Sequence, residues 1–229
     1  YILVPHIRQV WTELVDRFTR AQTWPSLIFL TLLLIAAILT IRFATGEPMD
    51  YDAGLYRLGS INYSSQYGTV PGLANLHDRF GFNSSLWPLA SIMGTGPWSG
   101  EGFRLISGFF LIALLTSTFI SVLFQRATGP SAGSWLLVIG TSFTLAISLT
   151  DTGRWLASPS QDLIAFITGL VSLVFFLDYL TRRNNYLAGN LALLIASISA
   201  SIRPLGWVLF TSILLVLCLQ LLRLPKKNF

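Results

Sequence analysis

The sequence predicts an all-helical transmembrane protein with about six membrane-spanning helices and a long first loop outside the cytoplasm. Three observations lead to this fold class. The 229 residues are 53% hydrophobic and only 11% charged, whereas a soluble domain carries about 25% charged residues. Six apolar runs approach the roughly 20 residues that a helix needs to cross a bilayer. A segment of about sixty residues, 44–102, separates the first two runs.

The same composition excludes several other classes of protein. Intrinsically disordered chains are poor in apolar residues, and this chain is rich in them. A single cysteine, Cys218, excludes a disulfide framework, and two histidines, His6 and His77, leave little for a histidine-based metal site. The pI near 9.7 does not indicate nucleic-acid binding, because the dense basic clusters flank apolar runs, as membrane anchors do.

The chain begins with a segment that predicts an interfacial helix. Apolar residues recur at helical spacing over 4–23 with charged residues between them, which is typical of an amphipathic helix on a membrane surface. We therefore assign 1–23 to a helix on the cytoplasmic side of the membrane. Because the chain starts at Tyr1 rather than Met, we expect it to be either a processed protein or part of a longer one.

The six apolar runs follow this segment in order. The first opens with Trp24-Pro25, an interfacial aromatic residue and a proline suited to the first turn of a helix. Glycine, proline and arginine residues separate the later runs, for example Arg182-Arg183 after the fourth and Arg203-Pro204 after the fifth. The expected spans are 24–43, 103–124, 135–150, 163–180, 186–202 and 205–222.

The charges predict the orientation of these spans. With six crossings, nine basic and three acidic residues lie on one side, and six basic and seven acidic residues lie on the other. Basic residues accumulate on the cytoplasmic side of membrane proteins. We therefore expect both termini in the cytoplasm, a transmembrane domain over 24–222, an extracytoplasmic loop over 44–102, and a basic cytoplasmic tail over 223–229.

Two carboxylates, Asp50 and Asp52, stand directly after the first expected span, where a helix over 52–67 is predicted to begin and to break at Gly68. Aspartate is a favoured N-cap, so one interpretation is that Asp52 caps this helix. The functional interpretation is a carboxylate that serves as a general base or as a ligand for a divalent metal ion, which makes such an ion a candidate cofactor.

Three further charged residues are expected on the same side as Asp52. Arg154 and Asp162 lie between the third and fourth spans, and Arg203 lies between the fifth and sixth. A charge near the hydrocarbon boundary is costly, which makes it a candidate for function. The alternative, which the sequence favours equally, is that the arginines only extend from helix ends toward water.

At these residues the chain resembles a bacterial family of membrane proteins related to GT-C glycosyltransferases. The resemblance rests on residues 51–56 (YDAGLY), 70–77 (VPGLANLH), 81–85 (GFNSS) and, before the fourth span, 158–162 (SPSQD). It covers roughly residues 40–205 and is most specific in the long loop.

The resemblance implies a GT-C-like architecture and transfer of a sugar from a polyprenyl-phosphate donor on the outer face of the bacterial inner membrane. It implies that Asp52, together with Asp50, is the catalytic base. The implied substrate-binding residues are Arg154, Arg203, Asp162, His77 and Asn83.

The alternative function is a non-catalytic multi-pass subunit of a larger membrane-protein complex. The fifth span contains the small residues Ala196, Ser197, Ser199, Ala200 and Ser201, which permit close contact between helices. The expected partners are membrane lipids and, under this alternative, other membrane-protein subunits, with no nucleic acid.

Overall fold

The computed structural model of the protein describes residues 24–68, 71–81, 84–129, 131–150, 154–182 and 185–223, together with Thr12 and Asp16. All regular secondary structure in these ranges is helical, and no strand occurs within them. The predicted all-helical class is therefore confirmed for the described part of the chain. The interfacial helix predicted for 1–23 and the tail predicted for 223–229 lie almost wholly outside these ranges.

Each of the six predicted apolar runs forms a long helix. Bounds differ from the predicted ones by only a few residues. The largest shift at a helix start is in the third run, which begins at Ala132 because Ser131 and Ser134 form a reciprocal capping box. The helices are α2 (Trp24–Ala44), α5 (Gly102–Thr128), α6 (Ala132–Leu149), α8 (Gln161–Thr181), α9 (Tyr186–Ile202) and α10 (Gly206–Arg223).

Three of these helices contain stretches long and apolar enough to cross a membrane. They are Gly102–Val122 in α5, Ala132–Leu149 in α6, and Gln161–Thr181 in α8. The apolar parts described in α2, α9 and α10 are shorter, at Leu30–Ala44, Tyr186–Ile202 and Gly206–Gln220.

The connection between α2 and α5 is also helical, but in short pieces. The helix predicted for 52–67 is present as a π-helical turn, η1 (Ala53–Arg57), continuing into α3 (Leu58–Tyr67), and it ends at Gly68, whose φ is +66°. Only glycine adopts such a φ without strain. The remaining pieces are η2 (Leu73–Asn75), η3 (Asp78–Gly81), α4 (Leu86–Met93) and η4 (Gly96–Trp98), and a further short helix, α7 (Arg154–Ala157), precedes α8.

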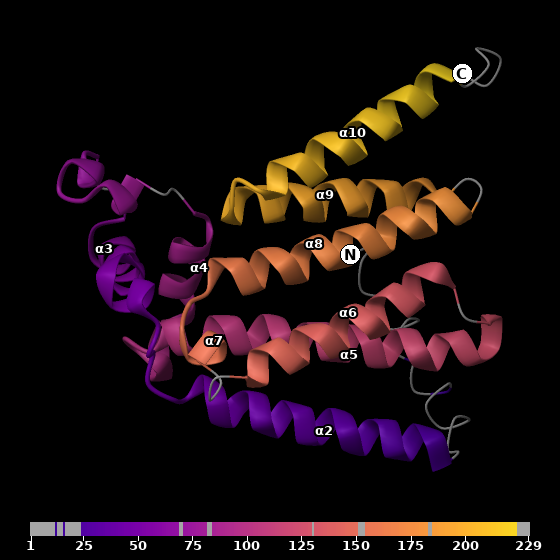
Figure 1. The fold of residues 1–229 in the computed structure, drawn as a ribbon, viewed down its shortest axis with the longest axis horizontal. Helices are drawn as coiled ribbons and strands as arrows, with labels where there is room; N and C mark the ends of the chain where they lie inside the picture. The colour runs from indigo at the N-terminus through magenta and orange to yellow at the C-terminus, as the bar shows by residue number, and fades with distance from the viewer. Residues whose placement is uncertain are drawn as a thin grey trace.

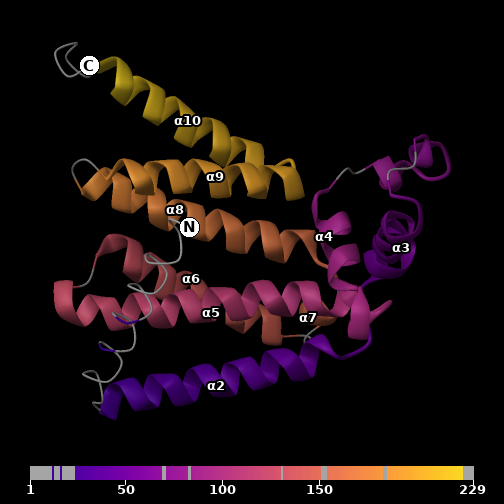
Figure 2. The same cartoon turned by 180° about the vertical axis from the view of Figure 1, so that it is seen from behind.

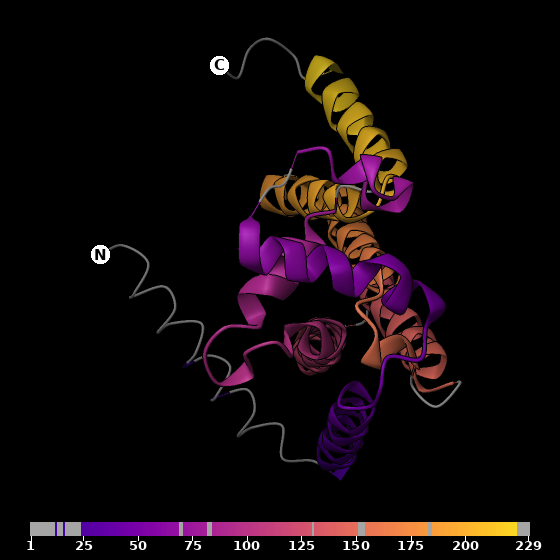
Figure 3. The same ribbon diagram turned by 90° about the vertical axis from the view of Figure 1, so that its left-hand side faces the viewer.

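The long helices lie roughly alongside one another, and the short pieces gather at one end of them. Figures 1 and 2 show α2, α5, α6, α8 and α9 in this bundle, with α10 diverging from α9. Seen from the end, α3 lies across the ends of the long helices (Figure 3). We call this end, which the connection 45–101 and α7 cover, the loop end, and the other end of the bundle the opposite end.

Small and hydroxyl side chains allow the long helices to pack closely. Ala192 and Ala196 of α9 are fully buried, and Ser172 of α8 donates a hydrogen bond to the carbonyl of Ala192 at 2.7 Å. Thr118 of α5 and Thr141 of α6 share a buried hydrogen bond of 2.6 Å. Such contacts suit helices in a bilayer, where apolar side chains gain little by leaving lipid for one another.

Two serines of the connection 45–101 form hydrogen bonds to the end of α9. The Ser84 hydroxyl donates to the carbonyl of Ile202 at 2.9 Å, and the Ser85 amide donates to the carbonyl of Ser201 at 3.1 Å. Beneath them, Leu86, Trp87 and Ala90 of α4 pack into a buried apolar cluster with residues of α5, α8 and α9. The η1, α3 and α4 parts of the connection therefore pack over the helix ends, next to the polar residues described below.

Candidate functional site

Asp50 and Asp52 lie between the end of α2 and the turn η1. Asp52 occupies the cap position of η1, but its backbone is already helical and its side chain makes no capping hydrogen bond. The N-cap interpretation of Asp52 is therefore wrong. Its carboxylate is instead paired with arginine side chains.

Arg57 pairs with both carboxylates. Its Nη1 donates to Oδ2 of Asp50, and its Nη2 donates to Oδ2 of Asp52 at 3.2 Å. Asp52 and Arg57 are five positions apart, and the intervening residues form a π-helical turn, whose hydrogen bonds join residues i and i+5 rather than i and i+4. Such turns occur frequently at functional sites. The Arg57 side chain is only 3% exposed, so this charge is buried between its partners.

A second arginine reaches Asp52 from the other side. Nη1 of Arg79, on η3, lies 2.5 Å from Oδ1 of Asp52, so each carboxylate oxygen of Asp52 has its own guanidinium partner. The two guanidinium carbons each lie 5.8 Å from the ring centre of Tyr56, within the range of a cation–π interaction. Unlike Arg57, Arg79 is 38% exposed.

Ser158 connects these charges to the segment before α8. Its hydroxyl is fully buried, receives a hydrogen bond from Nη1 of Arg57 at 3.3 Å, and donates to Oδ2 of Asp50 at 3.4 Å. Its carbonyl accepts from the Ser107 hydroxyl at 2.7 Å. The two residues that flank the 51–56 motif, Asp50 and Arg57, therefore both contact the 158–162 motif at Ser158. We call Asp50, Asp52, Arg57, Arg79 and Ser158 the loop-end cluster.

The loop-end cluster is partly buried, and each of its charged side chains has a partner of opposite charge. Asp50 is 23% and Asp52 32% exposed, so both carboxylates can be reached from solvent while their oxygens bind arginines. Within Arg57, Nε is buried without a hydrogen-bond partner among the described residues. Burying a guanidinium costs free energy unless its partners are well placed, and two separate segments supply those of Arg57: Asp50 and Asp52 after α2, and Ser158 before α8.

Asp162 and Arg203 form a second charged pair at the loop end. Oδ1 of Asp162, in the first turn of α8, lies 2.7 Å from Nη1 of Arg203, the residue that ends α9. The expectation that these residues share one surface is confirmed. Their partners, however, are each other, and no contact with the loop-end cluster is among the described interactions.

The other predicted site residues are only partly described. His77 lies beside the cluster: its Nδ1 accepts a hydrogen bond from the backbone N–H of Arg79 at 3.2 Å, and its ring contacts Phe80. It therefore helps to shape the turn that carries Arg79. Arg154 begins α7, but its side chain lies outside the described atoms, and Asn83 lies outside the described residues.

The predicted site residues did not include Arg57, Arg79 or Ser158. The spacing of Arg57 from Asp50 and Asp52 was visible, but in a regular α-helix residues three and four apart are neighbours, residues five apart lie on different faces, and residues seven apart are two turns away. Arg79 is 27 positions from Asp52 in a connection without regular periodicity. For Ser158, the only indication in the sequence was its place in the 158–162 motif.

The described residues do not fit a metal ion. No group of three or more histidine, cysteine, aspartate or glutamate side chains within them is arranged to hold one. The nearest carboxylates, Asp50 and Asp52, already bind guanidinium groups. We therefore derive no chemical step through a metal ion.

Together these features define a helical protein with apolar helices able to cross a membrane and a paired polar cluster at one end. The chain belongs to the family described as a domain of unknown function (DUF8201), whose family model matches residues 1–229. No curated protein and no solved structure matches the chain.

Proposed function

We propose that the protein is a GT-C-like membrane glycosyltransferase that transfers a sugar from a polyprenyl-phosphate donor outside the cytoplasm. In this proposal all six long helices cross a bacterial inner membrane, both termini are cytoplasmic, and the loop end faces outward. The lengths of α5, α6 and α8 support the crossing, and the excess of basic residues on the side of the termini supports the orientation.

The observation that carries the proposal is the setting of Asp52. Its carboxylate is one third exposed, lies at the end of a bundle of apolar helices, and stands beside a guanidinium that is itself partly exposed. A lipid-phosphate donor has its chain in the bilayer and its phosphate at the interface. Transfer from such a donor needs a cation for the phosphate and a carboxylate for the acceptor proton, side by side at that depth.

The step assigns a role to each residue of the cluster. The acceptor hydroxyl oxygen forms a bond to the anomeric carbon of the sugar, and the bond from that carbon to the donor phosphate oxygen breaks. Asp52 takes the acceptor proton, and the lipid phosphate leaves with the bonding electron pair. Arg79 binds the phosphate, because a guanidinium has five N–H donors and only one is bound to Asp52 in the described contacts. Arg57, being buried, positions Asp50 and Asp52.

The test is a transfer assay on membranes containing the full chain, with a panel of radiolabelled polyprenyl-phosphate-linked hexoses. We expect Asp52→Asn to lower kcat by about a hundredfold or more, the range of general-base catalysis. Arg79→Gln should mainly raise KM for the donor. Glu101→Gln, which removes an exposed carboxylate paired locally with Arg104 at the same end, is the control. Unchanged turnover in Asp52→Asn would exclude Asp52 as the base.

The second candidate function is a non-catalytic membrane subunit. It is favoured by one observation, that both oxygens of Asp52 are bound to arginines, as in an ion pair that only holds a fold together. Three of the five small residues of α9, Ala196, Ser199 and Ala200, are buried within the chain itself and do not favour it, whereas Ser197 is half-buried and Ser201 is exposed. Purification in mild detergent separates the two functions: a stoichiometric partner and no donor binding would favour the subunit.

A further inference from the structure

A groove of about 570 Å³ opens between α6, α8 and the start of α10. Its floor is α8, from Asp162 to Leu173, and its walls are α6 on one side and Leu205, Gly206 and Leu209 on the other. Of the fifteen lining residues, nine are aliphatic or aromatic, three are glycine, and three, Asp162, Ser199 and Arg203, are polar or charged. The volume lies within the range typical of small-molecule sites.

The charged residues of this groove lie at one end only. Asp162 and Arg203, the ion pair described above, stand at the loop end. The rest of the lining is uncharged, and its one polar side chain, Ser199, donates its hydroxyl hydrogen to the carbonyl of Ala165. The side chains of Asp162 and Arg203 are both between one third and one half exposed. One bond between them is described, so the guanidinium has N–H donors left and the carboxylate has acceptor capacity left. The groove is therefore charged at the loop end and mainly apolar over the rest of its length.

The length of the groove matches one leaflet of a bilayer. Asp162 and Leu173 are eleven residues apart on α8, which at 1.5 Å per residue is about 16 Å. Half of a hydrocarbon core of about 30 Å is about 15 Å. An extended lipid chain whose headgroup lies at Asp162 and Arg203 thus ends near Leu173.

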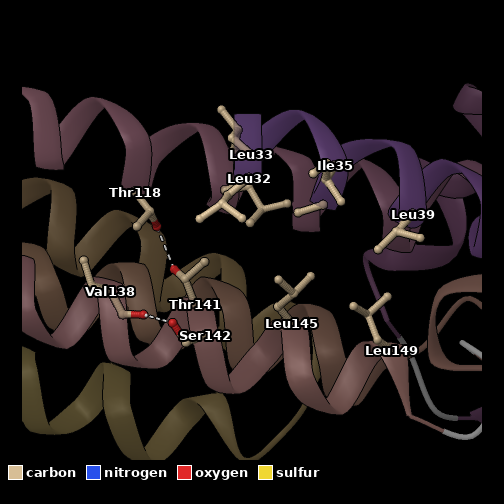
Figure 4. A pocket seen from close by; sticks show the side chains of 12 residues that line it. Leu32, Leu33, Ile35, Leu39, Thr118, Val138, Thr141, Ser142, Leu145 and Leu149 are labelled. Carbon is tan, nitrogen blue, oxygen red and sulfur yellow. Dashed lines mark hydrogen bonds between the residues drawn. The ribbon is translucent and has the colours of Figure 1, made fainter. Parts of the chain in front are cut away.

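A second groove, on the other side of α6, lacks these charges. It has a volume of about 350 Å³ and lies between α2, α5 and α6. Figure 4 shows that leucine side chains surround it, with Thr118, Thr141 and Ser142 as its polar members. Thr118 and Thr141 bond each other, and Ser142 bonds the carbonyl of Val138 in its own helix. This groove offers no charge to a headgroup and serves as an internal comparison.

We propose that the groove with Asp162 and Arg203 is a specific site for one zwitterionic phospholipid with an ethanolamine headgroup. An acyl chain lies along α8, Arg203 binds the phosphate, and Asp162 binds the ammonium. The charge pattern selects this occupant. A guanidinium and a carboxylate side by side complement a phosphate and an ammonium, whereas a lipid with only negative charge places that charge near Asp162 as well. The site is therefore distinct from the donor site proposed at Arg79.

The test measures lipid selectivity on the purified full chain. Native mass spectrometry in mild detergent compares dioleoyl phosphatidylethanolamine with dioleoyl phosphatidylglycerol at equal concentrations. We expect the ethanolamine lipid to bind about tenfold more tightly, the effect of one additional charge-assisted contact. Equal binding of the two lipids, or preference for the glycerol lipid, would overturn the proposal.

Variants of the two charged residues test their separate roles. Asp162→Asn should abolish the preference, because it removes the partner of the ammonium and the repulsion of the anionic lipid. Arg203→Gln should weaken both lipids. Since both side chains are partly exposed, we expect these variants to fold, and the ratio of the two lipids does not depend on the yield of protein. A preference that survives in Asp162→Asn would contradict the assignment.

Two further variants test which groove holds the chain. A Cβ built at Gly169 lies 3.7 Å from Leu209 and 3.9 Å from Ser199, so the first atom fits and a leucine fills the groove beyond it. Gly169→Leu should weaken binding of the ethanolamine lipid about tenfold or more. Ser142→Leu, which fills the comparison groove, should leave it unchanged. Equal effects of the two variants would place the lipid elsewhere.

This inference requires that α6 and α8 cross a membrane, but it does not require glycosyl transfer. Loss of turnover in Asp52→Asn with no lipid selectivity would support the proposed function alone. Selective lipid binding with no turnover on any donor would support the lipid site alone.

Discussion

The two ends of the bundle both carry paired charges, but the pairs are built differently. At the opposite end, Asp178 binds Arg182 at 2.7 Å and accepts from the Asn185 side chain at 2.8 Å, so the partners come from one short stretch of chain. At the loop end, Arg57 binds Asp50 and Asp52 in the segment after α2 and Ser158 before α8, 101 positions away. One arrangement is local and the other joins distant segments.

The difference indicates what each end does. An i,i+4 pair at a helix end whose arginine is exposed, as Arg182 is, contributes a few tenths of a kcal/mol and needs no further explanation. A buried guanidinium shared by distant segments costs desolvation free energy that a local pair does not. The loop end keeps this costly arrangement together with part-exposed groups, Asp52 and Arg79, that remain accessible to a ligand. This contrast supports the proposed function of the loop end, whereas the pair at the opposite end is explained by helix termination alone.

The largest effect is expected from Arg57→Met. Removing the buried guanidinium leaves Asp50 without its described arginine partner and only Arg79 to balance the two carboxylates. This loss should cost roughly 2–4 kcal/mol, somewhat less than for a fully buried pair because the carboxylates are partly exposed. Thermal unfolding in mild detergent, with unfolding enthalpies measured for each variant, gives this difference. A loss below about 0.5 kcal/mol, the size of an ordinary surface effect, would remove the distinction between the ends.

An intermediate effect is expected from Ser158→Ala. The hydroxyl is fully buried and bridges Arg57 and Asp50 at 3.3 and 3.4 Å, so its removal should cost about 1 kcal/mol. Combined with Arg57→Met, it should add less than its separate cost, because the two residues share one network. Additive losses measured in the same unfolding assay would show that Ser158 acts independently of the cluster.

The smallest effect is expected from Arg182→Met at the opposite end. Arg182 is 59% exposed and its partner Asp178 keeps a hydrogen bond from Asn185. The loss of stability should therefore stay below about 0.5 kcal/mol and shrink further in high salt. If this variant proved as destabilising as Arg57→Met, the local pair would have a structural role that its geometry does not show.

The long helices could be predicted from the sequence because the signal for each one is local. Apolar runs of sufficient length, a proline at the start of α2, and Arg203-Pro204 after α9 define the helices to within a few residues. The pairing of Asp162 with Arg203 could also be predicted. Asp162 lies at the start of α8 and Arg203 at the end of α9, and these two ends are adjacent because neighbouring helices run in opposite directions.

The loop-end cluster could be predicted only in part. Asp50 and Asp52 stood out because two acidic residues directly follow an apolar run. Their arginine partners could not be recognised in the same way. The turn that carries Arg57 is π-helical and does not follow the α-helical period, and Arg79 reaches Asp52 from a connection without regular periodicity. The N-cap interpretation failed for the same reason. It assumed a regular helix start where the backbone was already helical and two arginines compete for the carboxylate.

The most direct test of the division between the ends compares Asp52→Asn with Asp178→Asn in the membrane transfer assay. Both variants replace an arginine-paired aspartate with the same neutral side chain, one at each end of the bundle. We expect turnover of the polyprenyl-phosphate-linked hexose to fall about a hundredfold or more in Asp52→Asn and to remain within about twofold of the parent in Asp178→Asn. Equal turnover in the two variants would contradict the assignment of function to the loop end.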